Sequence, residues 1–195
     1  SFWLPELSPA GPVVAVVNLY TQHAQIYRNG IAIGYTSVST GKRGYGTPTG
    51  RFQVLEKRRF HRSSTYGNAP MPWMVRLTWS GIAFHSGALP GFPASHGCIR
   101  LYPEGIEELF GMVGVGTQVN IVNQPMKVGW FGDSMYLEFH APLGEDARTL
   151  EQNIAEARET VHKSVASRGL RVENDLIDAV VREESGMLVE VAYYQ

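Results

Sequence analysis

The sequence predicts a mainly β protein, with a sandwich- or barrel-like body of short strands, one or two short helices, and a C-terminal extension of helix and strand. Three observations lead to this prediction. Short apolar or alternating runs recur along the first two thirds of the chain. Glycine and proline punctuate them, with 21 glycines and 11 prolines in 195 residues. A long stretch of helical periodicity begins only after Pro125.

The first predicted strands lie close to the N-terminus. Residues 1–12 contain three prolines and are predicted to form an extended lead-in. The β-branched run over 13–19 is typical of a buried strand. Two further runs, 23–27 and 31–38, flank Asn29-Gly30, the dipeptide that a two-residue hairpin turn prefers. These residues therefore predict a tight β-hairpin.

The middle of the chain continues this pattern and adds one helix. Thr47-Pro48-Thr49-Gly50 predicts a turn before an alternating run. Pro103 is suited to the first turn of a helix, where its missing N–H costs nothing. The elements predicted here are strands over 51–57, 73–79, 82–85 and 118–122, and a helix over 103–112.

The C-terminal part has a different periodicity. Apolar residues at 147, 150, 154, 157, 161 and 165 predict an amphipathic helix over 145–168, which Gly169 ends. Asn174 is predicted to cap a second short helix. Strands are expected over 135–140 and 187–194. The chain thus divides into the lead-in 1–12, a β-body 13–124, and an extension 125–195 that we expect to pack on that body.

Composition excludes several classes of function. The chain has 17 basic and 18 acidic residues, whereas a nucleic-acid binder usually has a strong basic excess. It has no apolar run of about 18 residues, so no membrane span is expected. A single cysteine permits no intramolecular disulfide. Seven basic residues and one acid fall between 42 and 62, which indicates either a solvated face or the border of a site for an acidic ligand.

The single cysteine, Cys98, is the candidate nucleophile. It follows Ser95-His96-Gly97, residues that are poor strand formers and predict a sharp turn. Gly97 permits backbone conformations closed to other residues, and an N–H at such a turn can point at a developing oxyanion. On a regular strand, His96 and Cys98 would face the same side. The alternative is that Cys98 is a small buried hydrophobe.

His85 is the candidate general base, since a cysteine attacks as the thiolate and needs a group that takes its proton. It ends the apolar run 81–84. The carbonyl or hydroxyl of Ser86 can hold one ring nitrogen and fix the tautomer. The alternative is a histidine that merely satisfies its hydrogen bonds at a strand end. The remaining histidines, predicted to be surface or packing residues, are His23, His61, His140 and His162.

A metal site is the rival chemistry. His85, His96 and Cys98 could supply three zinc ligands and leave one position open. No nearby carboxylate or second close pair completes such a set. Glycines 41, 44 and 46 are not followed by a helical pattern, so they do not form a phosphate-binding loop. We therefore expect neither a metal nor another cofactor.

These residues resemble the L,D-transpeptidase catalytic domain, the YkuD family. Its upstream histidine and Ser/Thr-His-Gly-Cys motif correspond to His85 and Ser95 to Cys98. Gly41-Lys42 and the Thr-Pro-Thr-Gly-Arg-Phe stretch at 47–52 are similar to two further family motifs, and the resemblance covers residues 13–122. In two respects the chain departs from it: the interval from His85 to Ser95 is short, and Arg100 stands where some members have asparagine.

The resemblance implies acyl transfer at peptidoglycan. The Cys98 thiolate would attack the carbonyl between the L-centre of diaminopimelate and the terminal D-Ala of a donor tetrapeptide. An amine of a second stem peptide, or of a lipoprotein, would resolve the thioester. It also implies a cell-envelope or periplasmic location, with an export signal outside this sequence, and acylation by carbapenems. The alternatives are a hydrolase of the same fold, an L,D-carboxypeptidase or amidase, and a non-catalytic wall-binding module.

Three residues are expected to contact this substrate. Arg100 lies two positions after the nucleophile, so strand alternation would place both on one side, where a guanidinium can grip a carboxylate. The alternative for Arg100 is an ion pair with Glu104 or another acid of the helix predicted to follow. Ser95, in the motif, and Trp73, at the start of a predicted strand, are the other two candidates.

Overall fold

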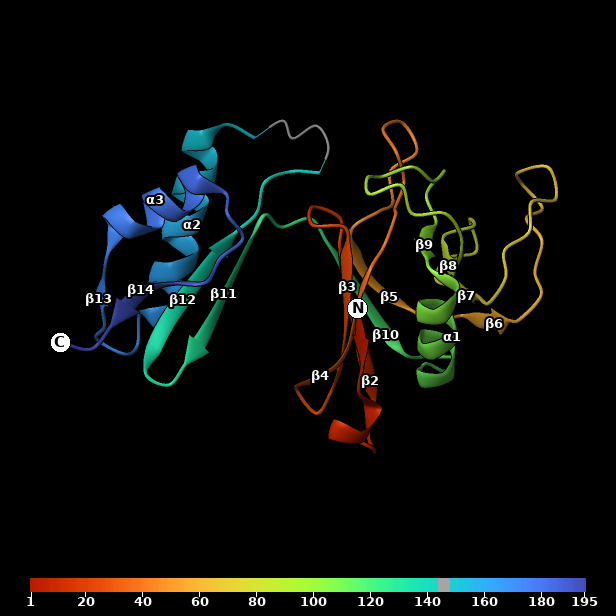
Figure 1. The fold of residues 1–195 in the computed structure, drawn as a ribbon, viewed down its shortest axis with the longest axis horizontal. Helices are drawn as coiled ribbons and strands as arrows, with labels where there is room; N and C mark the ends of the chain where they lie inside the picture. The colour runs from red at the N-terminus through yellow and green to blue at the C-terminus, as the bar shows by residue number, and fades with distance from the viewer. Residues whose placement is uncertain (144–147) are drawn as a thin grey trace. The chain divides into compact units, whose positions relative to one another are not determined.

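The computed structural model describes residues 1–143 and 148–195. It divides into two compact units, Ser1–Asn123 and Gln124–Gln195. Each unit has its own apolar core, and each is described by itself below. In the described part of the chain, three α-helices accompany open sheets of short strands (Figure 1). The prediction of a mainly β protein is therefore confirmed, although the sheets do not close into a barrel.

The first unit contains a six-stranded sheet. β10 (Gln118–Val122) runs parallel to β2 (Val13–Asn18), and the other neighbouring strands are antiparallel. The predicted hairpin is present, with Asn29 and Gly30 at φ 52° and 74°, as a tight turn of this kind requires. The strand order is β1 (Phe2–Trp3), β4 (Ile31–Ser37), β3 (His23–Arg28), β2, β10 and β5 (Gly50–Gln53).

The N-terminal residues join this sheet. Phe2 and Trp3 pair with β4, and a 3₁₀ turn, Pro5–Leu7, follows. The Trp3 ring packs against the core over Gly34, where an added Cβ would lie 2.7 Å from the ring. Glycine at this position thus makes room for the tryptophan.

A second, four-stranded sheet in the same unit has the order β6 (Glu56–Arg58), β7 (Met74–Arg76), β8 (Ala83–Ser86) and β9 (Ile99–Leu101). β8 and β9 are parallel. The helix predicted over 103–112 is confirmed as α1, Pro103–Met112.

The prediction of one strand over 51–57 is wrong, because the chain changes sheets within it. The N–H of Val54 bonds to Thr117 beside the first sheet, and the N–H of Leu55 bonds to Arg76 in the second. β5 and β6 are therefore strands of different sheets. Alternation along the sequence continues across this junction and does not reveal it.

The core of the first unit contains side chains from both sheets and from α1. Val17 and Ile26 come from the first sheet, Phe84 and Ile99 from the second, and Leu109 from the helix, all with at most 1% of their surface exposed. Burial of such side chains contributes roughly 1.5–3 kcal/mol each. One face of the second sheet is thus fixed to the core, which leaves its other face free for a site.

The second unit is a four-stranded antiparallel sheet with two helices. Its strand order is β11 (Met126–Phe131), β12 (Ser134–Phe139), β14 (Val189–Tyr193) and β13 (Arg171–Val172). The helices are α2 (Leu150–Val165) and α3 (Asn174–Glu183), and both contribute to the core. β11 was not predicted. That this unit packs on the first stays a prediction.

Two details of the predicted helices differ from the structure. α2 begins at Leu150 rather than at 145, and residues 144–147, including Ala147 of the predicted apolar face, lie outside the described residues. The prediction that Asn174 caps α3 is wrong, since Glu173 is the N-cap. The Asn174 side chain instead contacts His162, with its Oδ1 2.9 Å from Nε2. No helix in the described residues has the length and apolarity needed to cross a membrane.

The N-terminus of α2 yields a stability prediction. The Thr149 hydroxyl accepts from the Gln152 N–H at 3.2 Å, and the Gln152 side chain accepts from the Thr149 N–H at 2.9 Å. Thr149→Ala should lower the free energy of unfolding of the second unit by about 1 kcal/mol, as measured by urea denaturation.

Thr160→Ala on the same helix is the matched control. The Thr160 hydroxyl bonds back to the Glu156 carbonyl, a contact that does not cap the helix. This change should leave stability unaltered or raise it slightly. Equal losses in the two variants would show that the cap is not what matters.

Candidate active site

A pocket of about 360 Å³ lies on the face of the second sheet that is turned away from the core. Strand alternation explains this placement, since Val75, Phe84 and Ile99 point into the core while their neighbours point outward. Arg76, His85, Cys98 and Arg100 are among the outward residues, and residues between 61 and 71 form part of the pocket wall. The sheet thus places the nucleophile candidate and the base candidate on one surface.

The turn before Cys98 depends on Gly97 and Ser95. Gly97 has φ 123°, a conformation that L side chains rarely adopt. The buried Ser95 hydroxyl donates to the Cys98 carbonyl at 2.5 Å and accepts from the Gly97 N–H at 3.1 Å. The Ser95 hydroxyl thus holds the turn through its one donor and one of its two lone pairs. Ser95 also lines the pocket, and its contact with a substrate stays a prediction.

A second loop holds this turn from outside. The Thr47 hydroxyl donates to the Gly97 carbonyl at 2.7 Å and accepts from the Gly41 N–H at 2.9 Å. Gly41 also pairs with Ser95 as an isolated bridge. A Cβ on Gly41 would lie 2.0 Å from the Tyr45 carbonyl oxygen. The Gly41-Lys42 and Thr-Pro-Thr-Gly stretches therefore act as the frame of the Cys98 turn.

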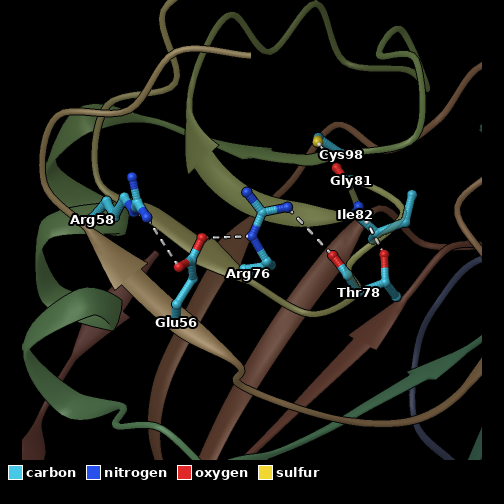
Figure 2. Close-up of polar contacts among 7 residues, drawn as sticks. All are labelled: Glu56, Arg58, Arg76, Thr78, Gly81, Ile82 and Cys98. Carbon is cyan, nitrogen blue, oxygen red and sulfur yellow. Dashed lines mark hydrogen bonds and ion pairs between the residues drawn. The ribbon is translucent and has the colours of Figure 1, made fainter. Parts of the chain in front are cut away.

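Cys98 is partly buried beside Met71, Met74 and Ala83. Its Sγ lies 3.2 Å from the Gly81 carbonyl oxygen, which accepts the thiol proton (Figure 2). Burial raises the pKa of the thiol above its ordinary value of 9.0, against the opposing effects of the Ala83 backbone and of nearby guanidinium groups. Cys98 is therefore a neutral thiol at rest, and as a nucleophile it would need a base to take its proton.

His85 has the tautomer that a base requires. Its Nδ1 lies 2.7 Å from the Ser86 carbonyl oxygen, which can only accept, so Nδ1 carries the proton and Nε2 is an acceptor. Burial lowers the pKa of His85 below 6.5, and the charge of Arg100 adds to this, although the Ser86 bond opposes it. The imidazole is therefore neutral near pH 7.

His96 lies at the rim of the pocket. It is exposed, stacks on Tyr66 with ring centroids 5.0 Å apart, and meets the Tyr45 ring edge-on at 4.7 Å. His96 and Cys98 do not lie on a regular strand, because Gly97 interrupts the backbone and β9 begins only at Ile99. Both nevertheless line the pocket.

Arg100 also lines the pocket, on β9 and in register with His85. No carboxylate of the described residues, Glu104 included, forms an ion pair with it. An added Cβ on Gly87 would lie 2.9 Å from the Arg100 side chain, so that glycine leaves space for the arginine.

Trp73, the third candidate for substrate contact, lies outside the pocket lining, and that contact stays a prediction. Its ring packs edge-on against Phe110 at 5.2 Å, next to the core, and it does not line the pocket. Trp73 has φ 58° and packs on the core side of the sheet, as Val75 does two residues later.

Sequence reasoning missed Arg76 and the pocket wall at 61–71. Arg76 lines the pocket from β7, between the apolar residues Val75 and Leu77. A lone arginine in an apolar strand was the available signal. In the described residues, no group of three His, Cys, Asp or Glu is arranged to hold a metal ion.

Comparison with known proteins identifies the first unit. The family model described as the L,D-transpeptidase catalytic domain, YkuD, matches residues 12–121, more than half of the chain. The chain belongs to the YkuD family. The stretch recognised by resemblance is thus confirmed as a member, and it coincides with the unit that holds the pocket.

Individual YkuD relatives agree with this assignment. The probable L,D-transpeptidase YbiS of Escherichia coli is 34% identical over 103 residues, which cover 52% of this chain and 34% of YbiS. The crystal structure of an L,D-transpeptidase from Stackebrandtia nassauensis has a TM-score of 0.54 at 26% identity, covering 58% of this chain and 57% of that one. L,D-transpeptidase 3 from Mycobacterium tuberculosis, with a faropenem-derived adduct, has a TM-score of 0.54 at 27% identity, with coverages of 57% and 60%. The chain thus spans about a third of the length of its first curated relative.

The close approach at Gly41 yields a prediction for this YkuD site. Gly41→Ala places a Cβ against backbone atoms, so the loop must shift and the Cys98 turn with it. A displacement near 1 Å at a reacting group can lower kcat/KM by about 100-fold. We expect a loss approaching this size in turnover of a peptide donor.

Gly46→Ala is the matched control, because nothing lies within 4 Å of a Cβ at that position in the same loop. It should retain the activity of the unaltered protein. A fully active Gly41→Ala variant would show that the frame does not determine the position of Cys98.

The protonation states yield a prediction for pH dependence. Because burial raises the pKa of Cys98, alkylation by iodoacetamide should follow an apparent pKa above 9.0 in the folded protein. In urea the same thiol, the only one in the chain, should return to its ordinary value. The acid limb of kcat/KM should fall below pH 6.5, because the pKa of His85 is lowered. A folded-state thiol pKa below 9.0 would contradict the neutral pair.

Proposed function

We propose that this chain is a cysteine acyl-transferase that acts on peptidoglycan stem peptides. The observation that carries the proposal is the neutral pair on one face of the second sheet: Cys98 after the Gly97 turn, and His85 with its Nδ1 bonded to Ser86. Membership of the YkuD family supports the substrate class, and the names of the relatives support the reaction.

The proposed first step is attack by Cys98 on the carbonyl before the terminal D-Ala of a donor tetrapeptide. His85 Nε2 takes the thiol proton as the C–S bond forms. The Gly97 N–H already donates to Ser95, so we assign the oxyanion to the N–H of Cys98 itself. The intermediate collapses as the C–N bond breaks, and the His85 proton passes to the departing D-Ala amine.

The second step resolves the thioester. An acceptor amine attacks the carbonyl, His85 takes a proton from that amine, and the C–S bond breaks as the thiol is restored. The acceptor would be a second stem peptide or a lipoprotein amine, which would place the reaction at the cell envelope. With water as acceptor the same site would act as an L,D-carboxypeptidase. If the site catalyses no reaction, the chain would instead be a module that only binds the cell wall.

Arg100 is the proposed carboxylate-binding residue of this reaction. It lines the pocket without a carboxylate partner in the described part of the chain. A guanidinium can bind a carboxylate through two parallel hydrogen bonds, and a donor stem peptide offers carboxylates on either side of the bond that breaks.

The test is the intact mass of the protein after incubation with a diaminopimelate tetrapeptide. We expect a thioester that raises the mass of the protein by the mass of the donor minus that of D-Ala. Cys98→Ala should form none, and Cys98→Ser should not substitute, because a serine hydroxyl is far harder to deprotonate. His85→Ala should slow acylation by roughly 10²–10⁴-fold.

His96→Ala is the control, because that ring is exposed at the rim of the same pocket. It should slow acylation much less than His85→Ala. The same adduct on Cys98→Ala would disprove the nucleophile. Products formed with and without an acceptor amine distinguish transfer from hydrolysis.

A further inference from the structure

One row of side chains crosses the second sheet and ends at the nucleophile. Glu56 on β6 is paired with Arg76 on β7, and Arg76 with Ala83 on β8. Phe84 is in register with Ile99 on β9, so the residues before them, Ala83 and Cys98, are also neighbours. Adjacent strands lie about 4.8 Å apart, so the backbone of Arg76 lies roughly 10 Å from that of Cys98. One bound peptide can span this distance.

The Arg76 side chain is held over this row. Its Nε donates to Glu56 Oε1 at 2.7 Å, and its Nη1 lies 3.5 Å from the Thr78 carbonyl oxygen (Figure 2). Only 16% of the side chain is exposed, yet it lines the pocket. A guanidinium has five N–H groups in a planar fork, and these two contacts leave others for a ligand. Ala83 carries only a methyl group, so the row leaves space between Arg76 and Cys98.

Charge in the pocket favours an anion. The described residues that line it include two arginines and three histidines, but no aspartate or glutamate. Glu56 lies on the side of Arg76 away from Cys98 and also contacts Arg58 at 3.5 Å. The three side chains Arg58, Glu56 and Arg76 therefore carry a net positive charge.

We propose that Arg76 binds a carboxylate of the acyl donor opposite Arg100, and that Glu56 positions its guanidinium. This inference rests on the proposed function. Arg76 on β7 and Arg100 on β9 flank the strand that carries His85. The diaminopimelate–D-Ala end of the donor has one carboxylate that leaves with D-Ala and one that stays on the acyl group. Two guanidinium groups on opposite sides would hold both and fix the scissile carbonyl over Cys98.

The experiment compares three donors: the free tetrapeptide, the same peptide amidated at its terminal carboxylate, and the peptide amidated at the diaminopimelate side-chain carboxylate. In the unaltered protein each amidation should lower kcat/KM about tenfold or more, since a charged hydrogen bond contributes roughly 1.5–3 kcal/mol. Arg76→Gln should show the same loss with the free donor. For Arg76→Gln, kcat/KM should be equal for the free donor and one of the two amidated donors, because the charge that Arg76 binds no longer matters. For Arg100→Lys, kcat/KM should be nearly equal for the free donor and the other amidated donor.

Arg58→Gln is the matched control. This variant also removes one guanidinium that contacts Glu56. Unlike Arg76, however, Arg58 is exposed and does not line the pocket. Its discrimination against both amidated donors should equal that of the unaltered protein. If Arg58→Gln and Arg76→Gln behave alike, the effect is one of general charge and direct binding by Arg76 is disproved.

Glu56→Gln tests the positioning role. It should raise KM for the free donor several-fold with little change in kcat, and it should keep part of the discrimination that Arg76→Gln loses. Thermal unfolding of each variant verifies that it is folded, and Arg76→Lys, which retains a charge at the site, provides a second variant if Arg76→Gln is not. If Arg76→Lys alone is folded, it should lose most of the same discrimination, because an ammonium cannot reproduce the fork.

Two failures are distinguishable. If the unaltered protein forms no Cys98 thioester with any donor, the proposed function fails. If it forms the thioester but the folded Arg76 variant retains full discrimination against both amidated donors, only the inference about Arg76 fails.

Discussion

The hydrogen bond from the Thr47 hydroxyl to the Gly97 carbonyl is the contact on which the site depends. It joins residues 50 positions apart and fixes the backbone just before Cys98, the candidate nucleophile. Gly97 can adopt its φ of 123° at little cost, but the same freedom would let the turn relax if nothing held it. Thr47 from outside and Ser95 from within together restrict the turn to one conformation.

Burial determines the protonation states of Cys98 and His85 in this site. It disfavours charge on both Cys98 and His85, raising the pKa of the thiol and lowering that of the imidazole. A thiol and an imidazole that are both neutral suit a mechanism in which the proton moves as the bond forms. The charges of Arg76 and Arg100 oppose this rise in the pKa of Cys98 without cancelling it, and they would favour the thiolate as it develops. The uncharged resting state and the positive surroundings are thus complementary.

The second sheet serves both the fold and the site because its two faces differ. One face packs Val75, Phe84 and Ile99 into the core, which holds the strands in register. The other carries Arg76, His85 and Arg100 into the pocket. A slip of one residue in any strand would exchange the faces and expose the apolar side chains, so core packing also enforces the alignment of the site.

Elements whose signals are local could be predicted from the amino-acid sequence. Asn29-Gly30 predicts the hairpin because few residues tolerate its backbone conformation, and Pro103 marks the start of α1. The spacing around Cys98 identified the candidate nucleophile and base, and the resemblance indicated the family.

Contacts between distant segments became known only from the three-dimensional structure. The change of sheet at Val54 and Leu55, the packing of Trp73 beside the core, and the row from Glu56 to Cys98 each depend on hydrogen bonds or packing between segments far apart in the chain. Alternation along one strand shows which residues share a face, but only the pairing of strands shows what that face meets.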